Sequence, residues 1–230
     1  EASLPAGGHL EGCRIGFDAG GSDRKVSAVV NGEVIHSEEV VWFPKVNEDP
    51  DYHYAGILDS FRRAAAKMPR VDAIGVSSAG IYIDNEVRVA SLFIKVPQDL
   101  FDEKVRNMYI RAAKEIGDVP LTVANDGDVT ALAGALSLKD GRVLGIAMGT
   151  SEAVGYVNKD GNLNGWLSEL AFVPVDYNKG AMVDEWSGDY GCGVKYFSQD
   201  SVIKLAGFAG IELDENASPA EKLKVVQELM

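Results

Sequence analysis

Residues 14–22 read Arg-Ile-Gly-Phe-Asp-Ala-Gly-Gly-Ser, and residues 142–151 read Arg-Val-Leu-Gly-Ile-Ala-Met-Gly-Thr-Ser. Each stretch is an apolar strand pattern that ends in a turn of glycine and hydroxyl residues, followed by a second apolar stretch. In both halves a hairpin signal, Asn31-Gly32 or Asp160-Gly161, begins 11 positions after the glycine of the turn. The matched plan predicts two lobes built alike. Two facing turns rich in backbone N–H groups suit one phosphate chain, which points to a nucleotide-handling enzyme with a cleft.

Composition restricts the class of protein. The 230 residues are 46% apolar and 25% charged, as expected of a soluble globular chain with one large domain or two lobes. No apolar run has the length of a membrane-spanning helix, and residues 1–9 lack the features of a signal peptide. The net charge of −13 argues against a nucleic-acid surface. It leaves ATP open, because N–H groups, helix ends and Mg²⁺ can hold phosphates.

The cysteines and histidines predict no thiolate metal site. Cys13 and Cys192 are the only cysteines and form no CxxC pair, so zinc and iron–sulfur sites lack ligands. The three histidines show no metal-ligand spacing. A reducing, cytoplasmic location fits this usage best.

Strand and helix patterns alternate along the first half of the chain, which indicates an α/β protein. Further strands are expected at 71–76 and 121–124, and a short strand pair at 81–91 that turns at Asp84-Asn85. Apolar stripes predict helices, carried by Ile57, Leu58, Phe61 and Ala65; by Phe101, Val105, Met108, Ala112 and Ile116; by Val129, Leu132, Ala133 and Leu136; and by residues 198–210.

The same patterns predict three parts: a flexible lead-in at 1–12, an N-terminal lobe at 13–139 and a partial C-terminal lobe at 140–230. A capping box with proline at the first helical position, Ser218-Pro219-Ala220-Glu221, starts a last helix that stops at Met230 without a cap. The second lobe also has fewer elements than the first. We therefore expect a C-terminal portion to be missing, and the apolar face of the last helix to suit a homodimer or a complementing chain.

Asn125 and Asp126 lie between a predicted strand and a predicted helix. An aspartate at that point can accept a proton from a hydroxyl nucleophile, and an asparagine can bind sugar hydroxyls. Asn and Asp are also among the best helix N-caps, so the residues alone leave both interpretations open. Asp128 competes with Asp126 for either role.

The two glycine turns are the candidate phosphate sites. In the first, Gly20 and Gly21 let the backbone approach phosphate oxygens, Ser22 adds a hydroxyl, and Asp18 can hold Mg²⁺ through water. The second turn consists of Gly149, Thr150 and Ser151. An ordinary glycine hairpin turn with a solvated aspartate is the alternative interpretation of the first.

Two further sites are candidates for substrate binding. Ser78 and Gly80 follow a buried strand, where ligands of open α/β sheets bind. Glu169 can bind two adjacent sugar hydroxyls, and Trp166 can pack on an apolar sugar face. The alternative interpretations are a turn of small residues for Ser78 and Gly80, a surface glutamate for Glu169 and a core tryptophan for Trp166.

Four segments in order resemble the motifs of ROK-family sugar kinases, which belong to the actin-like, ribonuclease H-like ATPase superfamily. They lie at residues 17–22, 124–128, 147–151 and 165–172, and the resemblance covers roughly residues 13–200. It implies an α/β, ribonuclease H-like actin-type ATPase fold with two similar lobes of mixed sheets, the second incomplete.

The resemblance also implies roles for the candidate residues. Asp18 with residues 20–22 would form the first phosphate motif and residues 149–151 the second, with ATP and Mg²⁺ as cofactors. Asn125 and Glu169 would bind the sugar, and Asp126 would be the general base.

The sequence departs from the family pattern at three positions. Asp23 replaces the usual lysine, although Lys25 is near, and Phe172 replaces a zinc-ligating histidine. The cysteine cluster is reduced to Cys192, so no zinc is predicted.

The leading hypothesis is an ATP-dependent kinase of a monosaccharide, with Asp126 as general base. A non-catalytic sugar-sensing module is the second hypothesis, although residues 1–12 are too short for the basic helix-turn-helix domain usual in regulators of the family. A third hypothesis is an actin-like ATPase that acts on a protein, although activators of that kind tend to need iron–sulfur cysteines. Sugar-independent ATP hydrolysis would favour the third.

Overall fold

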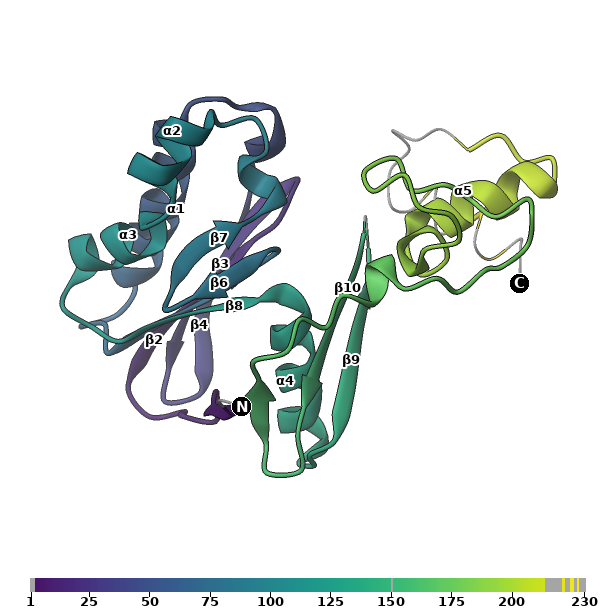
Figure 1. The fold of residues 1–230 in the computed structure, drawn as a ribbon. Coiled ribbons are helices and arrows are strands. Elements are labelled where there is room, and N and C mark those ends of the chain that lie inside the picture. The colour runs from purple at the N-terminus through teal and green to yellow at the C-terminus, as the bar shows by residue number, and fades with distance from the viewer. Residues whose placement is uncertain (1–2, 150, 214–220, 222–223, 226, 228–230) are drawn as a thin grey trace.

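The structure is a computed structural model that describes residues 3–149, 151–213, 221, 224–225 and 227. Thr150 and most of the helix expected from Ser218 to Met230 lie outside the described residues. Two larger sheets organise the chain, one of five strands in the order β4-β3-β2-β5-β8 and one of four in the order β1-β11-β10-β9 (Figure 1).

The five-stranded sheet comprises β2 (Cys13–Ala19), β3 (Asp23–Val30), β4 (Glu33–Val41), β5 (Ala73–Ser78) and β8 (Leu121–Asn125). Strand β2 pairs antiparallel with β3 and parallel with β5, which in turn pairs parallel with β8. The carboxyl ends of β2, β5 and β8 therefore meet at one edge, where the register sets Ala19, Ser78 and Asn125 side by side. The hairpin between β3 and β4 turns at Asn31 and Gly32 as predicted, with φ of 50° and 83°.

Helices α1 (Pro50–Ala65) and α3 (Met108–Ile116) pack together on one side of this sheet (Figure 1). Helix α1 begins with Asp49 as N-cap, whose carboxylate accepts the Asp51 N–H at 2.9 Å. Phe61 on its buried face packs edge-on against Phe17 of β2, with ring centroids 5.4 Å apart. Ala64 is fully buried, and the predicted Ala65 is partly buried and packs against the same core.

The helix expected between residues 101 and 116 is interrupted. It comprises α2 (Gln98–Leu100), a π-helical turn η3 (Phe101–Val105), and then α3. The carbonyl of Arg106 accepts the N–H of Val87 at 2.9 Å. That carbonyl therefore bonds to a strand instead of to an N–H one turn further along the helix. That strand, β7 (Glu86–Val89), forms the predicted pair with β6 (Ile81–Ile83). Short helical turns η1 (Pro44–Val46) and η2 (Ser91–Phe93) complete this part of the chain.

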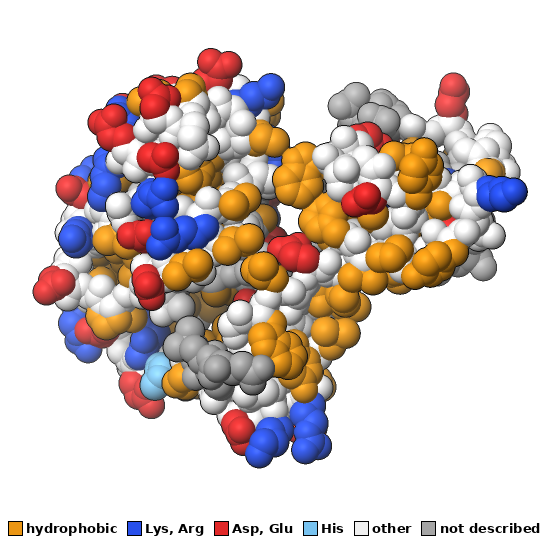
Figure 2. All heavy atoms as spheres, in the orientation of Figure 1, with side chains coloured by type: hydrophobic (Ala, Val, Ile, Leu, Met, Phe, Trp, Pro, Cys, Tyr) orange, Lys and Arg blue, Asp and Glu red, His pale blue; other side chains and the backbone are white. Residues whose placement is uncertain are grey.

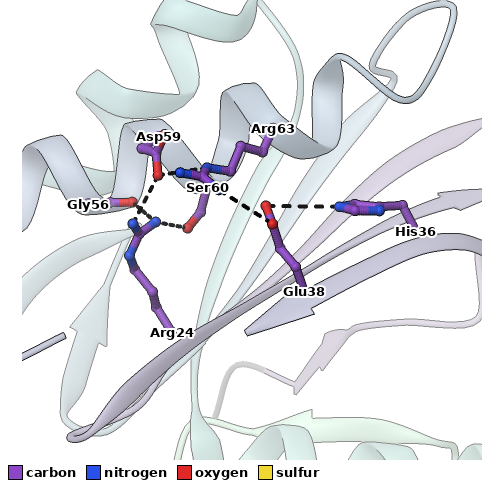
Figure 3. A network of polar contacts seen from close by, with 7 residues as sticks. All are labelled: Arg24, His36, Glu38, Gly56, Asp59, Ser60 and Arg63. Atoms are coloured by element: carbon purple, nitrogen blue, oxygen red, sulfur yellow. Dashed lines mark hydrogen bonds and ion pairs between the residues drawn. The ribbon is translucent and has the colours of Figure 1, made fainter. Parts of the chain in front are cut away.

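A polar network ties β3 and β4 to α1 (Figure 3). The guanidinium of Arg24, which is 8% exposed, donates to the Gly56 carbonyl at 2.6 Å and to Asp59 at 2.9 Å, and also bonds the Ser60 hydroxyl. Arg63 bridges Asp59 to Glu38. Because Arg24 is the second residue of β3, the network anchors the strand immediately after the first glycine turn.

The four-stranded sheet contains β9 (Val143–Met148), β10 (Glu152–Val157), β11 (Asn162–Asn164) and β1 (Ser3–Pro5). Residues 3–5, predicted to lie in a flexible lead-in, instead pair antiparallel with β11. The sequence predicted no strand there because pairing with a strand some 160 positions away leaves no local pattern; an edge of β11 offers the partner groups.

Helix α4 (Asp126–Leu138) covers one face of this second sheet. Its buried residues are Gly127, Ala131 and Ala135, and Leu132 packs against them as predicted. The predicted stripe was wrong at Ala133 and Leu136, which are exposed. A methyl group on Gly145 of β9 would lie 2.5 Å from the Cα of Ala131, which shows how closely helix and sheet approach. Small residues permit that approach. The lobe boundary between residues 139 and 140 stays a prediction.

The chain then runs through mostly irregular structure to α5 (Gln199–Phe208), by way of η4 (Leu170–Phe172) and η5 (Gly193–Lys195). Ala171, Cys192 and Val194 form a small apolar cluster with Phe172, whose ring lies 5.3 Å from that of Trp186. Figure 2 shows hydrophobic side chains gathered along this part of the molecule and charged ones over the five-stranded part. Among the described residues, no helix is long and apolar enough to cross a membrane.

Candidate functional site

The candidate site lies at the carboxyl edge of β2, β5 and β8. Asp18 is near the end of β2, and its Oδ1 accepts the hydroxyl of Ser77 on the neighbouring β5 at 2.8 Å. Asn125 ends β8, and Asp126 begins α4. Parallel pairing therefore brings together side chains that are far apart in sequence.

Asp126 is partly buried at the first position of α4, where its Oδ1 accepts the Gly127 N–H at 3.1 Å. Burial raises the pKa of Asp126, and the negative charge of Asp18 raises it further against the opposing effect of the Gly127 bond. A carboxylate whose pKa is raised is a better proton acceptor than an ordinary aspartate. The helix cap is a different residue, so Asp126 is not needed for capping.

That cap is Asn125. Its Oδ1 accepts the Gly127 N–H at 2.8 Å, and its Nδ2 donates to the Gly80 carbonyl at 2.9 Å. Gly80 has a φ of +131°, and a methyl group there would lie 2.3 Å from the Val89 carbonyl oxygen. Gly80 thus fixes Asn125 through its backbone, and the proposed sugar contacts of both residues stay predictions.

Ser78 does not face the site. It is fully buried, and its hydroxyl accepts from the hydroxyls of Tyr82 at 2.7 Å and Tyr109 at 3.2 Å. Burial raises the pKa of Tyr109 to about 12, so that phenol stays a donor. Sequence analysis did not propose Ser77 as a site residue. Strand alternation could have identified it: Ile74, Val76 and Ser78 share the buried face of β5, so Ser77 lies on the opposite face.

Two more carboxylates lie near Asp126. Burial, together with the charge of Asp126, raises the pKa of Asp128 to about 6. Glu169 is exposed, yet the protein around it removes enough water to raise its pKa, and the charge of Asp126 adds to the effect. Trp166, three positions before Glu169, is 56% exposed and is therefore a surface residue and not a core residue. Figure 2 shows acidic side chains at the centre of the molecule, where its two parts meet.

This acidic surface fits hydroxyl donors and a hydrated cation. Carboxylate oxygens accept sugar hydroxyls, and Mg²⁺ keeps several waters while binding one or two carboxylates. Within the described residues, no group of three or more acidic, histidine or cysteine side chains is placed to hold a metal ion directly. The binding of Mg²⁺ by Asp18 through water stays a prediction.

The first glycine turn is held from one side by Trp42. The indole N–H of Trp42 donates to the Gly20 carbonyl at 2.8 Å, and its backbone N–H donates to the Ser22 carbonyl at 3.2 Å. A methyl group on Gly20 would lie 2.7 Å from the Asp23 carbonyl oxygen, so the turn requires glycine there. The Ser22 hydroxyl donates to Asp23 at 2.9 Å and is already engaged.

The second turn joins β9 to β10. The Gly149 N–H donates to the Ser151 carbonyl at 3.0 Å, and the Gly149 carbonyl accepts the Gln199 N–H at 2.9 Å. A methyl group on Gly127 would lie 2.4 Å from the Val154 carbonyl oxygen, so α4 begins against β10. Val154 is three residues from Ser151, which puts the second turn about 10 Å along the strand from the start of α4.

Solved structures share the fold of this chain. A ROK family transcriptional regulator, a homologue of the E. coli MLC protein, superposes with a TM-score of 0.69 at 19% identity, covering 96% of this chain and 60% of that one. A ROK family glucokinase from Streptomyces griseus, in complex with glucose and AMPPNP, gives 0.61 at 21%, covering 86% and 62%. The chain has the ROK fold. The predicted actin-type α/β fold is thus confirmed.

The ROK hexokinase from Thermus thermophilus also matches, with a TM-score of 0.63 at 16% identity, covering 94% of this chain and 73% of that one. The sequence matches no protein-family model, and no curated protein matches it. This chain spans about three fifths of the first two ROK structures. The ROK fold itself is shared by kinases and a regulator.

Proposed function

We propose that the chain forms the sugar-binding and phosphoryl-transfer region of an ATP-dependent monosaccharide kinase. The proposal is carried by one observation: Asp126, with a raised pKa, begins α4 beside Asp18 at the carboxyl edge of three parallel strands. The glucose and AMPPNP bound to the Streptomyces griseus glucokinase give the ligand classes to test. Two lobes divided near residue 139 are part of the same proposal.

In the proposed reaction Asp126 accepts the proton of a sugar hydroxyl. The hydroxyl oxygen forms a bond to the γ-phosphorus, and the bond from that phosphorus to the β–γ bridging oxygen breaks, which releases ADP. Asn125 and Glu169 orient the sugar through its hydroxyls. Bound Mg²⁺ would neutralise charge on the transferred phosphoryl group.

The first turn fits the phosphate chain by its backbone. Within the described part of the chain, the N–H groups of Gly20, Gly21 and Ser22 donate no hydrogen bond. Successive free N–H groups in a turn make an anion-binding concavity. The second turn, residues 149–151, stays a candidate phosphate site from its residue types alone, because its Gly149 N–H already donates to the Ser151 carbonyl.

The test is sugar-dependent release of ADP from Mg-ATP across a panel of monosaccharides. Asp126→Asn keeps the size of the side chain and removes the base, so we expect turnover to fall by about 10²–10⁴-fold. Asp118→Asn, at an exposed loop position, is the matched control and should keep wild-type turnover. Near-normal turnover by Asp126→Asn would refute the assignment of the base.

A sugar-sensing module of the same fold is the second candidate. It is favoured by the second turn, where the Gly149 N–H is already bonded to the Ser151 carbonyl. Calorimetry separates the two functions. Sugar binding without any phosphorylated product, in a chain that also binds no ATP, would favour the sensor.

A further inference from the structure

Lys45 lies over the first glycine turn, although it is 24 positions from Gly21 in the sequence. A methyl group on Gly21 would be 3.0 Å from the Lys45 Cε and 3.2 Å from its Nζ. Lys45 is exposed, and among the described residues its ammonium has no hydrogen-bond or ion-pair partner. An unpaired ammonium at this distance adds positive charge to a turn that offers free N–H groups.

The backbone around Lys45 is fixed. Lys45 is the middle residue of η1, and the carbonyl of Pro44 lies 2.9 Å from the Nε2 of His53, a fully buried ring on α1. Trp42, three residues earlier, is bonded to the carbonyls of Gly20 and Ser22. These contacts fix the backbone of the segment that carries Lys45 next to the turn. Only the flexible Lys45 side chain then needs to adjust to a ligand.

Of the two lysines near the first turn, Lys45 is the one whose charge is available to an anion. The ammonium of Lys25 is paired with Asp23, which also accepts the Ser22 hydroxyl. That pair is neutral overall, so Lys25 has little charge to offer a phosphate. The pairing also keeps the Asp23 carboxylate, which would otherwise repel an anion, neutralised.

We infer that Lys45 binds the phosphate chain held at residues 20–22, and that Lys25 does not. The inference rests on the proposed function and deepens it by naming the cation of the phosphate-donor site. The ligand class is a triphosphate chain, either free or attached to a nucleoside, because the Lys45 ammonium and the three N–H groups would donate to phosphate oxygens and would make no contact with the nucleoside.

The test compares dissociation constants for two probes, Mg-ATP and Mg-tripolyphosphate, measured by calorimetry. Lys45→Ala should weaken both by about tenfold or more, as expected for loss of a charge-assisted contact. Lys45→Arg should retain most of the affinity. The matched control is the double variant Asp23→Asn with Lys25→Ala, which removes both charges of the neutral pair and should change the affinity less than about twofold. Raising the salt concentration should narrow the difference between wild type and Lys45→Ala.

Each other outcome contradicts the inference. Equal affinities of wild type and Lys45→Ala would overturn it, as would a larger loss in the Asp23→Asn, Lys25→Ala double variant, or a wild type that binds neither probe. A loss confined to Mg-ATP would place Lys45 against the nucleoside and would also overturn it. Sugar affinity, measured in parallel, should be unchanged in Lys45→Ala. A wild-type chain that binds both probes but transfers no phosphate to a sugar would refute the proposed function and leave the role of Lys45 standing.

Discussion

Asp128→Asn should stabilise the protein at neutral pH. The pKa of Asp128 is raised to about 6, first by burial and then by the charge of Asp126. Relative to an ordinary aspartate this is a difference of about 2 pH units, which corresponds to at most about 3 kcal/mol. Because the side chain is only partly buried, solvent screening reduces the expected penalty to about 1 kcal/mol.

The sign follows from the direction of the pKa change. The folded protein holds the Asp128 proton more tightly than the unfolded chain does, so the carboxyl group carries no penalty below about pH 4, where both states are protonated. Between about pH 4 and pH 6 the unfolded state loses its proton first, and stability falls. The penalty is then constant at higher pH.

Position on the helix works in the opposite direction. Asp128 is in the first turn of α4, where the helix dipole favours a negative charge by about 0.3–1 kcal/mol. The pKa is raised nevertheless, so burial and Asp126 outweigh the dipole. An asparagine of similar size avoids the desolvation penalty, which is why a gain in stability is expected rather than a loss.

The assay is urea unfolding followed by circular dichroism at a series of pH values. At about pH 7.5 the variant should exceed wild type by about 1 kcal/mol, equivalent to about 2–4 °C in midpoint temperature for a chain of this length. At about pH 4 the two should coincide. Asp118→Asn should follow wild type throughout. A variant that is no more stable at neutral pH, or a gap independent of pH, would refute the reasoning.

Two further predictions use matched pairs of variants, both measured by urea unfolding. Gly127→Ala would set a methyl group 2.4 Å from the backbone of β10 and should cost about 2–3 kcal/mol. Gly134→Ala, where the nearest atom is 3.4 Å away, should be neutral or stabilise by up to about 1 kcal/mol; equal changes in the two would contradict the close packing of α4. Arg24→Met leaves the Gly56 carbonyl without this donor and should cost about 2 kcal/mol. Arg62→Met, which removes an exposed pair at 3.4 Å, should cost less than about 1 kcal/mol, and a similar loss in both would argue against the network of Figure 3.

Local chemistry was enough to predict most elements of the first part of the chain. Alternating apolar residues predicted β2 and β5, and Asn31-Gly32 and Asp84-Asn85 predicted two hairpins, because turn residues and strand periodicity act over a few positions. The failures involve distant partners. Strand β1 exists only because β11 offers an edge, and the helix expected at 101–116 is broken where β7 takes a carbonyl.

By itself the sequence determined which residues are candidates: two glycine turns, an aspartate after a strand, and the order of motifs that predicted the ROK fold. Tertiary structure decided how those candidates are used. It made Asn125 the helix cap, turned Ser78 into the core and Ser77 toward Asp18, and brought Lys45 from a separate loop to the first turn. The physical reason is that a strand or turn is specified by neighbours in the chain, whereas burial, pKa and the partners of a charge depend on contacts between segments that only folding brings together.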